Sequence, residues 1–281
     1  MNRRLALLCP RGAVDVESFS RGRFDADPQA VYDRWSEFTA WVAEHAQDIE
    51  HAEARPYDES DLGAPVPAPR QVFAIGLNYR DHAAEAGLPL PENGPVVFAK
   101  FPSSITGPGA VVELPSDAVD YEAELVVVIG TPGHRVAADD AWSHVAGLTL
   151  GQDISERVVQ FQGPTPQFSP GKSFPGFSPI GPVLVTPDEF DDADDIELGC
   201  TLNGRRMQQG RTRDMVFTVP RLIAFLSAIV PLSPGDLIFT GTPAGIGWAR
   251  DPKIVLRDGD RLVTHAEVIG EMTTTFIAAA R

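Results

Sequence analysis

Residues 121–129, with the sequence YEAELVVVI, constrain the fold more than any other segment of this chain. Successive side chains of a strand point to opposite faces, so the apolar run that follows Glu124 predicts a strand buried on both faces. Glu122 and Glu124 are two residues apart, so they share one face and enter the same core. Two buried carboxylates repel each other and lose solvation, and a divalent cation would remove both penalties. Oxygen ligands of this kind suit Mg²⁺, Mn²⁺ or Ca²⁺.

A third acid strengthens the metal hypothesis. Asp153 directly follows an apolar segment, residues 145–152, that we expect to form another strand. An aspartate in this place commonly caps a turn, and the acidic strand could equally end at the surface and leave Glu122 and Glu124 in water. If the two strands are neighbours, the three carboxylates form one site with coordination positions left for water or substrate. Such a site is typical of a catalytic Mg²⁺ or Mn²⁺.

The rest of the chain is rich in short strands. Glycine and proline contribute 25 residues each to the 281, and so many chain breakers favour many turns over a helical bundle. We expect strands at residues 71–77, 96–100, 122–129, 145–152, 182–186, 197–202 and 205–207, with more between 236 and 281. Asn203-Gly204 indicates a hairpin, and one clear helix at residues 219–230 ends before Pro231. The fold class is therefore α+β, dominated by a mixed sheet or roll.

The first 69 residues predict a small N-terminal α/β domain. Asp27-Pro28 is typical of a helix start, and apolar residues at helical spacing, Trp35 and Trp41 among them, predict one amphipathic helix from residue 28 to about 50. We interpret both tryptophans as core residues. Alternating prolines in residues 57–70 exclude a helix interior and indicate a linker, so residues 70–281 form the main domain.

The net charge excludes several kinds of partner. Asp and Glu number 39 and Lys and Arg 23, which gives a net charge of −16 and a pI near 4.7. Nucleic acids and anionic membrane surfaces would be repelled, and no stretch approaches the ~20 apolar residues of a membrane span. Cys9 and Cys200 have no metal-ligand spacing and are too few for a disulfide framework. The apolar run after the basic N-terminus is too short for a signal peptide, so we expect a cytoplasmic protein with inert thiols.

Three further clusters contain candidate functional side chains. His82 and Glu85 are three residues apart, so on a helical turn the carboxylate would face the imidazole and raise its basicity. The remaining candidates are polar residues downstream of Asp153: Arg157, Gln160, Lys172 and Thr242. Thr242 lies in a glycine-rich loop that lets the backbone approach a ligand closely, although the loop matches neither a P-loop nor a dinucleotide fingerprint. Taken alone, Arg157, Gln160 and Lys172 are most simply explained as solvated surface. The His82 and Glu85 pair is most simply explained as an exposed helix N-terminus, and the glycine-rich loop as an ordinary long turn.

Together these segments resemble the fumarylacetoacetate hydrolase family, in particular its bacterial acylpyruvase and 2-hydroxyhepta-2,4-diene-1,7-dioate isomerase-like members. The motifs that carry the resemblance are GLNYRDH at residues 76–82 with Glu85, DYEAEL at 120–125, GQD at 151–153 with Arg157 and Gln160, GKSF at 171–174 with Gly181-Pro182, and TGTPAGIG at 240–247. Their order and spacing fit the family from about residue 70 to 275. Several motifs in the correct order are far more specific than any one of them.

The resemblance implies a β-roll-like catalytic domain, usually in a homodimer. It implies a Mg²⁺ or Mn²⁺ ion held by Glu122, Glu124 and Asp153. Residues 73–77 are apolar here, so no fourth carboxylate ligand is expected upstream of His82.

The resemblance also implies a small-molecule 2-oxo acid substrate, often with a 1,3-dicarbonyl unit. The implied substrate-binding residues are Arg157, Gln160 and Thr242. The implied catalytic residues are Lys172, which would stabilise charge, and His82 with Glu85, which would activate water on a segment able to act as a lid.

We therefore expect a metal-dependent hydrolase that cleaves a C–C bond in an acylpyruvate or fumarylpyruvate, as in aromatic catabolism. Because His82 and Glu85 are both present, hydrolysis ranks before two alternatives on the same site, decarboxylation of oxaloacetate and isomerisation of an unsaturated 2-hydroxy diacid. A catalytically silent binding protein is the alternative from another class, and loss of a metal ligand would favour it. For the acyl group, the sequence offers only candidates: Phe98, Lys100, Ser103, Gln167 and Phe168.

Overall fold

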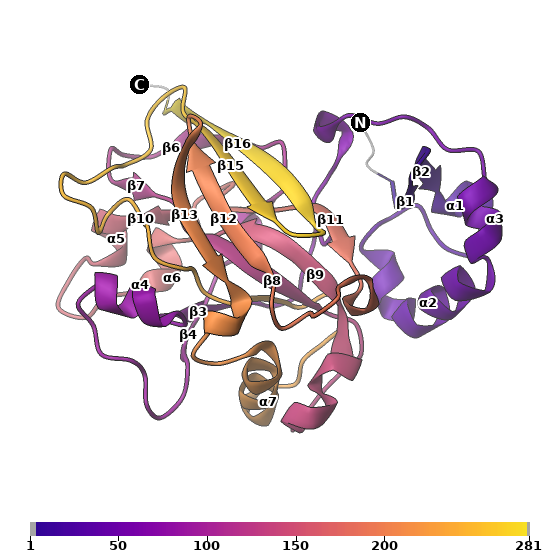
Figure 1. Ribbon diagram of the computed structural model, residues 1–281, viewed down its shortest axis with the longest axis horizontal. Coiled ribbons are helices and arrows are strands. Elements are labelled where there is room, and N and C mark those ends of the chain that lie inside the picture. Colours follow the sequence, from indigo (N-terminus) through magenta and orange to yellow (C-terminus); the bar gives the residue numbers. More distant parts are fainter. Residues whose placement is uncertain (1–3, 280–281) are drawn as a thin grey trace.

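The computed structural model describes residues 4–279, and two β-sheets form its centre (Figure 1). The larger sheet has seven strands in the order β4-β3-β14-β8-β9-β11-β5. These strands are β3 (Val72–Gly76), β4 (Val96–Ala99), β5 (Ile105–Thr106), β8 (Ala123–Ile129), β9 (Val145–Gln152), β11 (Ser178–Val185) and β14 (Leu237–Phe239). Two parallel pairs, β3 with β14 and β5 with β11, lie among antiparallel ones, so the sheet is mixed.

The smaller sheet has five strands in the order β13-β12-β15-β16-β6. They are β6 (Val111–Leu114), β12 (Glu197–Leu202), β13 (Arg205–Arg211), β15 (Arg261–Ala266) and β16 (Gly270–Ala278). Asn203 and Gly204 join β12 to β13 with positive φ angles of 52° and 78°, so the predicted hairpin is confirmed. A separate short pair consists of β7 (Val119–Asp120) and β10 (Ser155–Glu156).

The acidic strand β8 is buried on both faces, as its apolar run predicted. Leu125 and Val127 pack toward the smaller sheet and the helix α7 (Val219–Ile229), which forms where the sequence predicted it. Val126 and Val128 pack on the opposite face, which residues of the N-terminal part cover. The mixed α+β class with curled sheets is thus confirmed.

The other helices of the main part are short. They are α4 (Arg80–Glu85), α5 (Arg157–Gln160) and α6 (Phe168–Gly171), with 3₁₀ turns at Pro102–Ser104, Ala138–His144, Pro187–Glu189 and Thr212–Asp214. A further 3₁₀ turn, Glu59–Asp61, precedes residue 70. Within residues 4–279, no helix combines the length and apolar character that crossing a bilayer requires.

The N-terminal part lies beside the larger sheet (Figure 1). It contains β1 (Ala6–Cys9), β2 (Gly12–Asp15), α1 (Val16–Phe19), a 3₁₀ turn (Ala30–Arg34), α2 (Trp35–Glu44) and α3 (Ala46–His51). The expectation of one helix over residues 28–50 is therefore wrong, because the segment is broken near Arg34 and His45. At His45 the φ angle is −109° and the imidazole Nδ1 donates to Trp41 O (2.9 Å), so a side chain competes with the backbone for a helical acceptor.

Buried side chains connect the N-terminal part to the larger sheet. Trp41 is 4 % exposed and belongs to one apolar cluster with Val72 of β3. Residues 57–70 contain no strand and only the 3₁₀ turn Glu59–Asp61, yet Val66 among them is fully buried in the same cluster. A domain boundary near residue 70 stays a prediction, since side chains on both sides of it share a core.

We expect Trp41→Ala to lower the free energy of unfolding by about 3–5 kcal/mol, because it removes a large side chain from this shared cluster. Urea unfolding followed by circular dichroism and by fluorescence should show one cooperative transition at a lower midpoint. Tyr57→Ala is the control, since Tyr57 is 40 % exposed and its loss should cost less than about 0.5 kcal/mol. Two separate transitions would contradict a shared core.

Candidate active site

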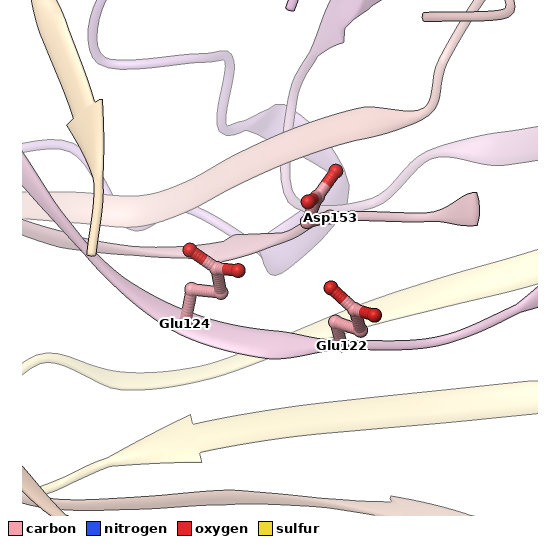
Figure 2. Close-up of side chains that lie close together, drawn as sticks. All are labelled: Glu122, Glu124 and Asp153. Atoms are coloured by element: carbon pink, nitrogen blue, oxygen red, sulfur yellow. The ribbon is translucent and has the colours of Figure 1, made fainter. Parts of the chain in front are cut away.

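The three acids singled out in the sequence meet between neighbouring strands (Figure 2). β8 and β9 are antiparallel, and the Asp153 N–H donates to Glu122 O (2.9 Å). One carboxylate oxygen from each of Glu122, Glu124 and Asp153 lies within 4.8 Å of the other two. These residues are 7, 1 and 1 % exposed, so the alternative in which the strand end leaves the acids in water is wrong.

Positively charged side chains pair with two of the three carboxylates. Lys172 Nζ donates to Glu122 Oε2 (2.8 Å) and to Asp153 Oδ2 (2.6 Å). Arg157 Nη2 donates to Glu122 Oε1 (2.6 Å), and the Lys100 ammonium donates to Asp153 Oδ1. Burial raises the pKa of Glu122, but Lys172 and Arg157 outweigh it and hold this pKa well below the ordinary range.

Glu124 differs from the other two acids. In the described part of the chain, no basic side chain lies within 4 Å of its carboxylate, and its Oε2 accepts the Gly241 N–H (2.8 Å). Burial, and then the charges of Asp153 and Glu122, raise the pKa of Glu124 well above its usual value. A hard divalent cation would supply the missing positive charge, and the donors are all oxygens. The residues present therefore fit Mg²⁺ or Mn²⁺, which Glu122, Glu124 and Asp153 would hold.

A pocket of about 440 Å³ opens onto these acids. Seven of the nine predicted site residues line it: His82, Glu85, Glu122, Arg157, Gln160, Lys172 and Thr242. Glu124 and Asp153 are buried beside it and do not line it. The structure thus places candidates from five separate elements and loops around one cavity.

The candidates for contact with an acyl group have mixed outcomes. Phe98 and Phe168 line the pocket. Lys100 is buried against Asp153 instead, and Ser103 and Gln167 are exposed outside the lining, so these three expectations are wrong. Each lies near a lining residue in sequence, but the local backbone directs its side chain elsewhere.

Helix α4 brings His82 and Glu85 to the pocket. His82 Nδ1 lies 3.5 Å from Glu85 Oε2, a contact longer than a hydrogen bond, and both Glu85 oxygens accept the Gly245 N–H at 3.0 Å. Burial raises the pKa of Glu85, but the contacts with His82 and Gly245 outweigh it and leave the pKa lowered. An ionised carboxylate therefore faces the imidazole at neutral pH.

The lowered pKa of Glu85 predicts a pH effect on stability. A depressed folded-state pKa contributes stability above the unfolded value of about 4.3, and this contribution is lost as the pH falls through the folded value. We expect Glu85→Gln to cost about 1–3 kcal/mol at pH 7 and less in acid, because the Gly245 N–H and His82 no longer face a charged acceptor. Melting temperatures measured from pH 7 to 3 test this, with the exposed Glu92→Gln as control. A cost that is independent of pH would contradict it.

The glycine-rich loop that follows β14 holds two of these acids through its backbone. Gly241 donates its N–H to Glu124, and Gly245 donates to Glu85. Their φ angles are +98° and +110°, which residues with side chains rarely adopt. Glycine is therefore required at both positions, in agreement with the close backbone approach expected of this loop.

Other side chains orient the polar wall of the pocket. Gln160 Oε1 accepts from Arg157 Nη1 (2.9 Å). The Thr242 hydroxyl donates to Ala123 O (2.8 Å) and accepts from Gln208 Nε2 (2.7 Å). Gln208 is 1 % exposed and had no distinguishing signal in the sequence, because its position depends on contacts with distant residues such as Ala123, whose N–H donates to Gln208 Oε1 (2.9 Å).

The sequence did not single out Asp120 except within a motif, yet this fully buried acid organises the site. Asp120 Oδ2 accepts from Arg157 Nε (3.1 Å) and Nη2 (2.6 Å). Asp120 Oδ1 accepts the Gly247 N–H (2.8 Å), and Oδ2 also accepts the Trp248 N–H (3.0 Å). Asp120 precedes Glu122 by two residues, so strand alternation places both on one face, and that spacing is the signal that identifies it.

We expect Asp120→Asn to reduce kcat/KM by about 10–100-fold, because Arg157 loses one of its two carboxylate partners and its orientation. Stability should fall by up to about 3–5 kcal/mol, since a buried charge is left less compensated. Steady-state kinetics and urea unfolding measure the two effects. The control is Asp117→Asn, on the exposed stretch before β7, which should change neither kcat/KM nor stability. Wild-type activity in the Asp120→Asn protein would show that Arg157 does not depend on Asp120 for its orientation.

Residues 71–277 match the family described as fumarylacetoacetate (FAA) hydrolase C-terminal. The chain is 43 % identical over 217 residues to the mitochondrial oxaloacetate tautomerase FAHD2A of Homo sapiens, covering 76 % of this chain and 69 % of that protein. It is 45 % identical over 215 residues to the 2,4-didehydro-3-deoxy-L-rhamnonate hydrolase of Sphingomonas sp. (strain SKA58), covering 75 % of each.

Solved structures agree with these matches. A Mycobacterium smegmatis protein provisionally named HpcE superposes with a TM-score of 0.90 at 49 % identity, covering 100 % of this chain and 98 % of that one. The fumarylpyruvate hydrolase of Pseudomonas aeruginosa, in complex with Mn²⁺ and pyruvate, has a TM-score of 0.68 at 28 % identity, covering 75 % and 91 %. The motifs, the fold and the matched residues lead to one conclusion: this chain belongs to the fumarylacetoacetate hydrolase family.

Proposed function

We propose that this protein is a Mg²⁺- or Mn²⁺-dependent hydrolase that cleaves the C3–C4 bond of a 2,4-dioxo acid. The observation that carries the proposal is that His82 and Glu85 line the same pocket as Glu122 and Lys172. Hydrolysis requires a water-activating pair beside a cation that stabilises an enolate, whereas decarboxylation requires only the cation. The related Pseudomonas hydrolase, which holds Mn²⁺ and pyruvate, supports the same substrate class.

The charges around the acids favour an anionic substrate. The three acids, the cations that pair with them and the acid that pairs with Arg157 make a buried set of three cations and four carboxylates: Lys100, Arg157, Lys172, Asp120, Glu122, Glu124 and Asp153. With all of them ionised the set carries one net negative charge, and a divalent cation changes this to one net positive charge. The bound ion would supply Lewis-acid stabilisation for negative charge on the 2-oxo oxygen. A carboxylate substrate is therefore attracted to this site although the whole protein is acidic.

The side chains of the pocket account for the bond changes. His82, held beside the Glu85 carboxylate, takes a proton from water, and the water oxygen adds to C4 of the substrate. The C3–C4 bond then breaks, C4 leaves as a carboxylic acid, and the electron pair passes to C3 and the 2-oxo group as an enolate. Lys172 stabilises that charge, and the His82 imidazolium returns its proton to C3 to give pyruvate. We assign binding of the substrate carboxylate to Arg157 and Gln160, which line the same pocket.

Tautomerisation or decarboxylation of oxaloacetate is the second candidate. The 43 % identity to the human oxaloacetate tautomerase supports it. Both reactions pass through an enol or enolate of a 2-oxo acid, so Lys172 and the three carboxylates would serve them without a base for water. Isomerisation of 2-hydroxyhepta-2,4-diene-1,7-dioate uses the same type of enolate and belongs in the same test.

The test is a substrate panel with the purified Mn²⁺-loaded protein. Acetylpyruvate, fumarylpyruvate, oxaloacetate and 2-hydroxyhepta-2,4-diene-1,7-dioate are incubated separately and the products identified by NMR. We expect pyruvate plus a carboxylic acid from a 2,4-dioxo acid, with the highest kcat/KM of the panel. Turnover of oxaloacetate alone would establish the second candidate. A protein that retains no divalent ion after dialysis against Mn²⁺ would contradict both.

Three expectations from the sequence stay predictions. They are assembly as a homodimer, a cytoplasmic location and a place in aromatic catabolism. Light scattering of the purified protein measures its oligomeric state directly.

A further inference from the structure

The pocket has a charged inner end and an apolar outer part. At the inner end, Glu122, Arg157 and Lys172 are 7, 3 and 2 % exposed. The outer part is lined by apolar side chains from several loops and elements: Leu88, Val96, Phe98, Phe161, Phe168 and Trp248. Leu88 and Phe161 are about half exposed, at 51 % and 49 %, so this part forms the mouth of the pocket.

Three aromatic rings lead from the charged end to the mouth. Lys172 Nζ lies 5.3 Å from the centroid of the Phe98 ring. The Phe98 and Phe168 centroids are 5.4 Å apart at 70°, and those of Phe168 and Phe161 are 6.1 Å apart at 78°, both edge-to-face. A substrate whose carboxylate end lies near Lys172 would extend its other end along these rings.

The outer part offers no partner for a second carboxylate. The cations that line the pocket are Arg157 and Lys172, and each already pairs with two acids at the inner end. Glu85 is the charged side chain on the His82 side, and it is an anion. Lys253 stands 3.5 Å from the centroid of the Trp248 ring but does not line the pocket. A distal carboxylate would therefore lose part of its hydration among these rings and gain no counter-charge from the residues that line the outer part.

We propose that the substrate of this protein carries an apolar acyl group of about the size of a phenyl ring, rather than a second carboxylate. This inference rests on the proposed 2,4-dioxo acid function and narrows its substrate class. Aromatic rings stack favourably edge-to-face, and an apolar group removed from water against them is stabilised. Fumarylpyruvate and other dicarboxylates are therefore poor substrates, and an aroylpyruvate is a good one.

A binding measurement tests the apolar subsite without relying on hydrolysis. 2-Oxo-4-phenylbutanoate and 2-oxoadipate share the 2-oxo acid end and lack the 4-oxo group, so neither can undergo the proposed cleavage. Calorimetric titration of the Mn²⁺-loaded protein should give a Kd roughly 10–100-fold lower for the phenyl compound, the range that an apolar pocket commonly discriminates. Equal affinities, or tighter binding of 2-oxoadipate, overturn the proposal.

A pair of matched variants tests whether the mouth of the pocket determines the preference for the phenyl compound. Phe161→Arg places a cation at the mouth and should reduce the preference at least about tenfold, by strengthening 2-oxoadipate binding and weakening binding of the phenyl compound. Phe101→Arg is the control, because Phe101 is also 49 % exposed but lies outside the lining. Both changes are at exposed positions, and circular dichroism verifies folding. An equal change of the Kd ratio in the two variants overturns the proposal.

Turnover separates this inference from the proposed function. With 2,4-dioxo-4-phenylbutanoate and fumarylpyruvate, we expect kcat/KM to favour the phenyl substrate roughly 10–100-fold. Binding preference for the phenyl compound without any cleavage would refute hydrolysis and leave the apolar subsite standing. Faster cleavage of fumarylpyruvate than of the phenyl substrate would overturn the apolar subsite and leave the proposed hydrolysis standing.

Discussion

We expect the Glu124→Gln variant to lose Mn²⁺ binding and yet to be at least as stable as the metal-free wild type. The amide has nearly the shape of the carboxylate, and it removes a buried charge that Asp153 and Glu122 repel. Mn²⁺ at 100 times its Kd should stabilise the wild type by about 2.7 kcal/mol and the variant not at all. Turnover should fall by about 10³-fold or more. Calorimetric titration and thermal unfolding with and without Mn²⁺ measure these effects.

Asp153→Asn provides the contrast. It too should abolish Mn²⁺ binding, but Lys100 and Lys172 both contact Asp153, so the metal-free protein should lose about 3–5 kcal/mol of stability. Glu113→Gln, an exposed acid on β6, should change neither property. Wild-type affinity for Mn²⁺ in the Glu124→Gln protein would show that the three carboxylates are not the ligands.

The second large effect concerns water activation. We expect His82→Ala to reduce hydrolysis of a 2,4-dioxo acid by ~10²–10⁴-fold, the usual contribution of a general base. Any decarboxylation of oxaloacetate by the same protein should fall less than about tenfold, because that reaction needs no activated water. Parallel assays of both reactions at saturating Mn²⁺ give the comparison. Unchanged hydrolysis in the metal-replete variant would remove His82 from the mechanism.

Lys172→Gln completes that comparison, because Lys172 would stabilise the enolate in every candidate reaction. We expect both activities to fall, each by about 10²–10³-fold, because a cation at the developing negative charge is lost. His82→Ala and Lys172→Gln together therefore distinguish a defect in water activation from a defect in enolate stabilisation. Equal losses of both reactions in both variants would contradict the separate roles.

The central part of the site could be predicted from the sequence because local rules determine it. Strand alternation places Glu122 and Glu124 on one face, and the apolar run after them requires burial. Asp153 ends the next long apolar strand, and antiparallel pairing brings it opposite Glu122. The contact of His82 with Glu85 follows from the pitch of one helical turn.

The features of the site and fold that could not be predicted from the sequence depend on contacts between distant segments. Lys100 follows β4, the edge strand of the larger sheet, and no local pattern shows that its ammonium reaches Asp153. Asp120 is recognisable by strand alternation. Its hydrogen bonds from Arg157 and Gly247, however, join three segments that are distant in the sequence. The break of the N-terminal helix at His45 likewise comes from a side-chain hydrogen bond that periodicity does not encode.

The glycine-rich loop has a consequence for how the substrate range of such an enzyme can change. Gly241, Gly245 and Gly247 hold Glu124, Glu85 and Asp120 through amide hydrogens alone. The side chains of the same loop, such as Ile246, face the ligand cavity. Replacing a side chain there can reshape the cavity while the amides keep the reactive carboxylates in place. Inserting or deleting one residue would displace those carboxylates together, so the loop tolerates substitution far better than a change of length.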